Sequence, residues 1–94
     1  MTTGKILTLH PDPEKTGVNI DRVKYDTVRE AAFSVLKREK AMKSMVFLQA
    51  IADEVGPGFD GSAAWYGESI KLDMEARGEL EHDRKRGVLW LLKK

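Results

Sequence analysis

The stretch from Ser62 to Leu92 most constrains the fold, because it combines a helix, a glycine stop and a hairpin. The helix is expected to begin at a cap, Asp60 or Ser62. It should end just before Gly78, since glycine takes the left-handed conformation at a helix end at little cost. Two short runs with strand character follow, and residues 84–87, Arg-Lys-Arg-Gly, turn the chain between them. The stretch therefore predicts a helix followed by a β-hairpin with a basic tip.

Two more helices are predicted before this stretch. The first begins near Arg22 or at a candidate N-cap, Asp26, and ends at Glu39. The second spans residues 44–55 and ends at a Gly-Pro-Gly stop. Between them, residues 41–42 have room only for a minimal strand. Apolar residues at helical spacing give the first helix its core face: Tyr25, Val28, Ala32, Val35 and Leu36.

Residues 1–20 are predicted to form an extended N-terminal arm, and residues 21–94 a single domain. Residues 5–9 are a short β-prone run that would make one edge strand. Residues 10–13, His-Pro-Asp-Pro, end this run, because each proline lacks an amide donor and pushes its predecessor into extended geometry. The alternative for the arm is a loosely ordered tail, because chain termini often fray.

The order strand, helix, short strand, helix, helix, strand, strand resembles that of a winged helix-turn-helix domain, a mainly helical α+β fold. Residues 72–81, LDMEARGELE, are similar to the end of the third helix where it enters the wing. More narrowly, the chain resembles a family of small bacterial winged-helix proteins without an established activity. The segments that carry this second likeness are residues 9–17, LHPDPEKTG, and residues 56–61, GPGFDG.

The resemblance implies a transcription-regulator-like DNA-binding module, in which the third helix enters the major groove and the wing contacts the backbone. Three consecutive cations at the wing tip suit phosphates, although a basic tip is also an ordinary solvated turn. By this likeness the candidate contacts are Ser62, Ala63, Ala64, Glu68 and Lys71 on the helix, and Arg84, Lys85 and Arg86 on the wing.

The charges of the third helix argue against base reading. Between Ser62 and Arg77 the helix carries two cations and three carboxylates, a net charge of −1. Its first two turns hold no arginine or asparagine, the residues that usually make bidentate contacts to bases. We therefore expect weak, salt-sensitive and poorly sequence-selective binding to double-stranded DNA.

A second hypothesis is a protein-interaction or homodimerisation module on the same fold, without nucleic-acid binding. The second helix is apolar on more than one side, and a strand at residues 5–9 can add to a neighbour's sheet. The candidate self-association residues are Ile6, Leu7, Met45, Val46 and Phe47.

The composition argues against several other classes of function. The net charge of +1 gives no global field towards nucleic acid or anionic membrane, and without cysteine there is no thiol chemistry. His10 and His82 lack a metal-ligand spacing, and no serine has a histidine partner motif. We expect no catalytic residue, metal, cofactor or small-molecule substrate. No apolar run reaches the roughly 20 residues that span a bilayer, and no signal peptide is evident, so we expect a cytoplasmic protein.

Overall fold

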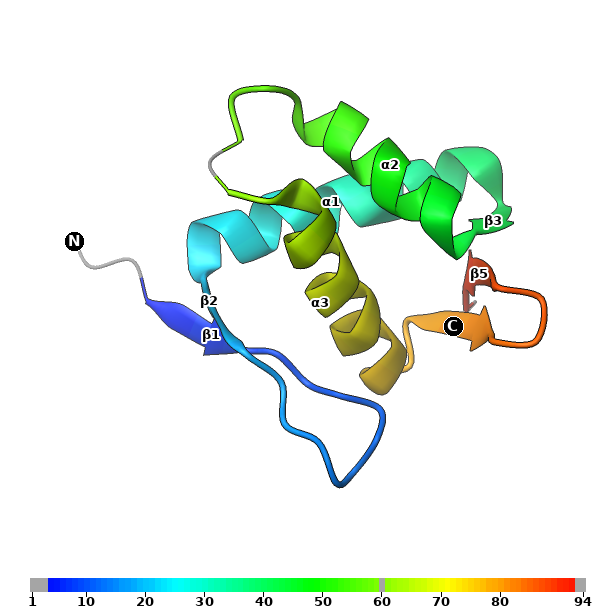
Figure 1. Ribbon diagram of the computed structural model, residues 1–94, viewed down its shortest axis with the longest axis horizontal. Helices are drawn as coiled ribbons and strands as arrows, with labels where there is room; N and C mark the ends of the chain where they lie inside the picture. Colours follow the sequence, from blue (N-terminus) through cyan, green and yellow to red (C-terminus); the bar gives the residue numbers. More distant parts are fainter. Residues whose placement is uncertain (1–3, 60, 93–94) are drawn as a thin grey trace.

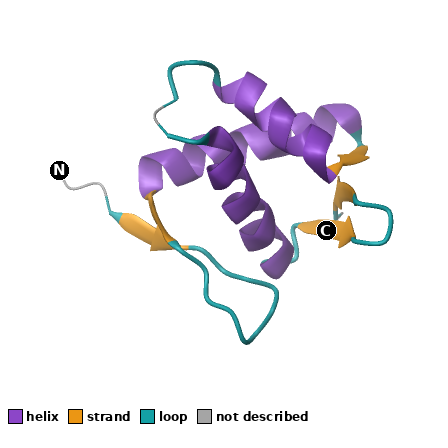
Figure 2. Cartoon of the chain, in the orientation of Figure 1, coloured by secondary structure: helices purple, strands orange, loops and turns teal. Residues whose placement is uncertain are grey.

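The computed structural model describes residues 4–59 and 61–92 as three helices and two small antiparallel sheets (Figure 1). The fold is therefore α+β, as predicted, and helices make up most of its regular secondary structure (Figure 2). In chain order the elements are β1 (Lys5–Leu7), β2 (Asn19–Asp21), α1 (Arg22–Glu39), β3 (Ala41–Lys43), α2 (Ser44–Val55), α3 (Ala63–Ala76), β4 (Leu80–Asp83) and β5 (Val88–Leu91).

The three helices pack against one another around one apolar core. The predicted apolar stripe of α1 is buried as a whole, which confirms that prediction. α3 approaches α2 closely at Gly67, where an added Cβ would lie 3.1 Å from the Leu48 side chain. The buried apolar residues are Ile20, Tyr25, Val28, Ala31, Ala32, Val35, Leu36, Phe47, Ile51, Ile70, Met74, Leu80 and Leu89.

The C-terminal hairpin (residues 80–91) forms a three-stranded sheet with β3, in the order β3-β5-β4. Met42 pairs with Leu89 on one side, and His82 pairs with Leu89 on the other. The minimal strand predicted at residues 41–42 is thus confirmed. Because β5 is the central strand, the short segment between α1 and α2 is tied to the far end of the described chain.

The N-terminal hairpin (residues 5–21) replaces the expected single edge strand. β1 and β2 pair with each other, Ile6 opposite Ile20, and Ile20 enters the core. Beyond the strands, the Thr8 amide donates to the Val18 carbonyl at 2.9 Å, and the Val18 amide donates to the Thr8 hydroxyl at 2.9 Å. Gly17 permits this close approach, since a Cβ there would lie 1.9 Å from the Thr8 carbonyl oxygen.

The ends of the helices follow the predicted signals in part. The Ser62 hydroxyl accepts from the Trp65 amide at 3.2 Å as the N-cap of α3, whereas Asp60 lies outside the described residues. Gly78 follows α3 with φ +76°, as the glycine stop requires. The prediction of Asp26 as the N-cap of α1 is wrong, because Asp21 holds the cap position without a side-chain bond. In residues 4–59 and 61–92, no helix has the length and apolarity to cross a bilayer.

Candidate functional site

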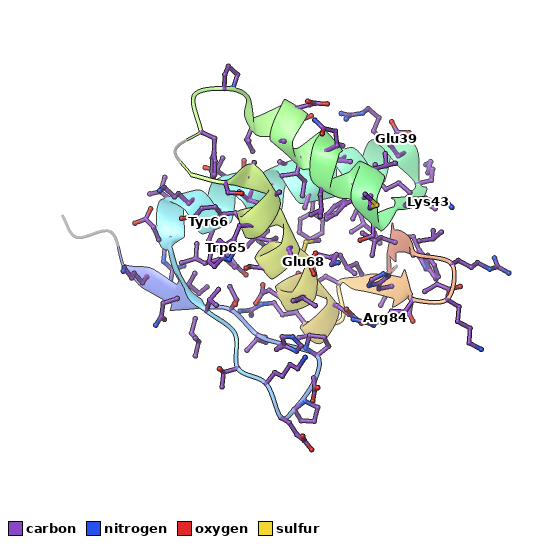
Figure 3. All side chains as sticks on the ribbon, in the orientation of Figure 1. Glu39, Lys43, Trp65, Tyr66, Glu68 and Arg84 are labelled. Atoms are coloured by element: carbon purple, nitrogen blue, oxygen red, sulfur yellow. The ribbon has the colours of Figure 1, made fainter. Side chains whose placement is uncertain are left out.

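A groove of about 700 Å³ runs beside the outward side of α3. Its walls are the loop of the N-terminal hairpin (residues 8–18) and the C-terminal hairpin, and α3 lies between them. In Figure 3, Glu68 lies on the α3 side of the groove and Arg84 on the side of the C-terminal hairpin. α3 contributes Glu68, Lys71, Leu72 and Glu75, and the C-terminal hairpin contributes His82 and Arg84.

The charged side chains on this side of α3 are paired with one another or with the hairpin. The Lys71 ammonium lies 2.8 Å from Glu68 and donates to the Ser44 hydroxyl at 3.3 Å. Lys71 is only 4% exposed. Arg84 donates to both carboxylate oxygens of Glu75, at 2.6 and 2.7 Å, and these bonds raise the pKa of Arg84. Lys71 and Arg84, both predicted to contact DNA, are therefore engaged within the protein.

Asp73 is the buried centre of a polar network that joins α1, α3 and the N-terminal hairpin. Its carboxylate accepts from the Leu9 amide at 2.8 Å, from the Tyr25 hydroxyl, and from the Arg77 Nε at 3.0 and 3.1 Å. Burial, and then the bond to Asp73, raise the pKa of Tyr25. Asp73 is fully buried, so the net charge of −1 counted along α3 does not describe the side of the helix that faces solvent.

His82 lies where the C-terminal hairpin meets α3, and burial disfavours the charged form of its ring. Desolvation, followed by the nearby charges of Lys71 and Arg84, lowers its pKa from the usual 6.5. The Nδ1 atom is buried and has no hydrogen-bond partner within the described part of the chain. On β4, Leu80 is buried and His82, two residues further on, is half-buried and lines the groove.

Three of the exposed cations lie together on β3 and on the turn of the C-terminal hairpin. Lys85 and Arg86 are exposed on the turn of the C-terminal hairpin, and the Arg86 side chain is 82% exposed. Lys43 is exposed on β3 and pairs with Val88 at the end of this turn. The Ser44 amide donates to the Gly87 carbonyl at 2.8 Å, which fixes the start of α2 against the turn. We call Lys43, Lys85 and Arg86 the basic edge.

The predicted DNA contacts therefore fall into three places. Glu68, Lys71 and Arg84 come together in the groove, and Lys85 and Arg86 belong to the basic edge. Ser62, Ala63 and Ala64 lie at the start of α3, away from the hairpin turn, where Ala64 is exposed and Ser62 caps the helix (Figure 1). The fold does not bring the eight residues to one continuous surface.

The predicted self-association residues are likewise divided. Phe47 is fully buried and cannot contact a partner, and Ile6 packs against the core. Met45 and Val46 are 83% and 55% exposed at the start of α2, and Leu7 is 56% exposed on β1. β1 and the start of α2 lie at opposite ends of the molecule in Figure 1, so these residues form two separate surfaces.

Two important residues were missed from the sequence. Lys43 had been assigned to a basic helix end, and only its pairing with β5 places it beside the hairpin turn. Asp73 was counted as a surface acid of α3. Its position four residues before Arg77 is a local signal for an ion pair within the helix, but its burial depends on contacts with the N-terminal hairpin and α1.

Residues 5–90 match the model of a family of unknown function, DUF6958. The chain belongs to this family. No curated protein and no solved structure matches the chain. Within residues 4–59 and 61–92, no group of three or more His, Cys, Asp or Glu side chains is placed to hold a metal ion.

Proposed function

We propose that this protein is a winged helix-turn-helix module that binds double-stranded DNA through backbone phosphates at the basic edge. In this reading α2 and α3 are the helix-turn-helix pair, and the C-terminal hairpin is the wing. The element order and the β3-β5-β4 sheet support the assignment. As fold likeness alone carries no function, the DNA proposal depends on the surface chemistry that follows.

The observation that carries the proposal is the convergence of Lys43, Lys85 and Arg86 on the amino end of α2. The side chain of Lys43, the N-cap of α2, makes no capping hydrogen bond, and the first-turn amides of α2 carry the positive end of the helix dipole. Helix amino ends with nearby cations bind phosphate groups. Because the net charge of the chain is only +1, a local concentration of cations is what brings a polyanion to this surface.

Phosphate contact is favoured over base reading by the state of α3. Its outward carboxylates, Glu68 and Glu75, are bound to Lys71 and Arg84, and Lys71 is buried. None of these cations is free to make the bidentate contact that identifies guanine. The proposed binding is therefore weak, salt-sensitive and nearly independent of sequence.

The test is a fluorescence-anisotropy titration of a mixed-sequence duplex at low salt and at several higher salt concentrations. The variant Lys43→Ala/Lys85→Ala/Arg86→Ala should lose most of the affinity. Its dependence of log affinity on log salt should flatten by about 0.9 for each phosphate contact removed.

A matched control removes three exposed cations on β1 and α1: Lys5→Ala/Arg22→Ala/Lys37→Ala. Both variants change the net charge equally, so a general charge effect would weaken both alike. Equal affinity losses, or a basic-edge variant that binds like the wild type, would contradict the proposal.

A second candidate function is self-association through the apolar start of α2. Met45, at 83% exposure, and Val46, at 55%, are adjacent apolar residues that face solvent. Sedimentation over a range of protein concentrations tests this candidate, with Met45→Ser/Val46→Ser as the variant. A dimer that becomes a monomer in this variant and shows no anisotropy change with DNA would favour it over DNA binding.

A further inference from the structure

We propose that the loop of the N-terminal hairpin is an autoinhibitory strap that covers the second half of α3 and restricts DNA to phosphate contacts. The inference rests on the proposed function and adds a regulatory element to it. Release of the strap would let α3 reach a DNA groove, so that binding becomes tighter.

The strap forms one wall of the groove beside α3. His10, Asp12 and Lys15 line the groove from the loop, across from His82 and Arg84 of the C-terminal hairpin. Leu72, the apolar residue of α3 in this groove, is half-buried. In Figure 1 the loop passes the end of α3 that leads into β4.

The width of the DNA major groove makes the strap a steric obstacle to the insertion of α3. The major groove is about 12 Å wide, and an α-helix with its side chains is about 10–12 Å across. The groove therefore admits one helix but not a helix with a loop against its side. While the strap is in place, the second half of α3 cannot lie in the major groove.

The strap is shaped internally and anchored at its base, where Thr8 is buried and Val18 packs against the core, and its attachment to α3 is separate from this anchor. Asp12 accepts from the Glu14 amide at 3.0 Å, and its carbonyl accepts from the Lys15 amide at 3.0 Å, so the tip is a formed turn. The Leu9 amide bonds to Asp73 at 2.8 Å, and within the described residues this is the hydrogen bond that joins the loop to α3. Opening the strap therefore requires the loss of this one hydrogen bond to α3.

Gly17 gives a way to open the strap in the full chain without changing a charge. A Cβ at this position would lie 1.9 Å from the Thr8 carbonyl oxygen and 2.4 Å from its hydroxyl, so Gly17→Ala forces the two sides of the loop apart. Thr8→Val is a milder second variant, because it removes the hydroxyl that accepts from the Val18 amide. Gly4→Ala is the control in the same arm, since its Cβ would meet nothing within 4 Å.

The first measurement is independent of DNA. The chain has no cysteine, so Leu72→Cys introduces a single thiol beneath the strap. We expect its reaction with a thiol reagent to be at least about fivefold faster with Gly17→Ala or Thr8→Val than with Gly4→Ala, the lower end of typical coupling between sites. Equal rates of thiol modification in all three backgrounds would contradict the proposal that the strap covers α3. Circular dichroism checks that each variant keeps its helices.

The second measurement is the DNA titration on the same variants without the added cysteine. Gly17→Ala and Thr8→Val should bind at least about fivefold tighter than the wild type, and Gly4→Ala should not differ from it. If loss of the basic edge abolishes binding while strap opening leaves affinity unchanged, the proposed function stands and the autoinhibition is overturned. If no form binds DNA, the proposed function and the autoinhibition both fail, and the thiol rates still establish whether the loop covers α3.

Discussion

The two hairpins on either side of α3 use their polar groups in opposite ways. The N-terminal hairpin turns a backbone amide, that of Leu9, inwards to the buried Asp73 and inserts Ile20 into the core. The C-terminal hairpin also anchors itself with apolar residues, Leu80 and Leu89, but its turn directs Lys85 and Arg86 to solvent. The N-terminal hairpin thus packs beside α3, whereas the C-terminal hairpin adds exposed cations to the surface of the molecule.

Residue type along the chain therefore does not reveal which charged side chains are paired within the protein. Arg84 and Arg86 lie two residues apart on the same turn. Arg84 forms two short bonds to Glu75, whereas the Arg86 Nε is 3.7 Å from Asp83. Buried, paired charges and exposed charges should therefore have different roles. We predict that substitutions near Asp73 alter stability, and that substitutions at the basic edge alter DNA binding.

The largest effect on stability is expected from Asp73→Ala. The substitution leaves the Tyr25 hydroxyl and the Leu9 amide without their acceptor, so the free energy of unfolding should fall by about 3 kcal/mol. Urea denaturation measures the change. Asp53→Ala, at an exposed carboxylate of α2, is the control and should stay within about 0.5 kcal/mol of the wild type. Similar losses of unfolding free energy in both variants would contradict the prediction that the buried Asp73 contributes more to stability than an exposed carboxylate.

A smaller loss is expected from Tyr25→Phe, which removes one hydrogen bond to Asp73 but keeps the ring in the core. The free energy of unfolding should fall by about 1 kcal/mol. The double variant with Asp73→Ala tests the coupling, because the two changes act on one bond. If their effects simply add, the Tyr25–Asp73 bond does not hold the network together.

The stability of the protein should also fall as the pH drops below about 6.5. Burial lowers the pKa of His82 in the folded protein, so the unfolded chain takes up this proton first as the pH falls through its ordinary value of 6.5. His82→Gln should therefore flatten the decline of the unfolding free energy between pH 7.5 and 5.5. Parallel declines in the two proteins would contradict a neutral, buried ring.

The smallest effects are expected at the tip of the C-terminal hairpin. Arg84→Ala breaks an exposed ion pair with Glu75 and should lower the free energy of unfolding by about 0.5 kcal/mol. Lys85→Ala/Arg86→Ala should leave it unchanged to within about 0.5 kcal/mol. A clear loss of stability in the double variant would mean that Lys85 and Arg86 contribute to the folding of the protein, contrary to this prediction.

The sequence predicts the elements well because their signals are local. The stripe on α1, the Ser62 cap and the stop at Gly78 each depend on residues a few positions apart. The placement of Asp73 and Lys43 depends on partners far along the chain, Leu9 and Val88, and no local pattern encodes such contacts. The prediction that Phe47 takes part in self-association was wrong for a related reason. A helix that is apolar on two sides does not reveal which side faces the core, and Phe47 is buried.

The central place of β5 in its sheet has a consequence for the order of folding during synthesis. β3 emerges from the ribosome between α1 and α2, but its partner follows only after two further helices have been made. Until then the start of α2 lacks the bond from the Ser44 amide to Gly87. The nascent chain can assemble its helices early, whereas the surface that carries the basic edge is completed only once β5 has been translated.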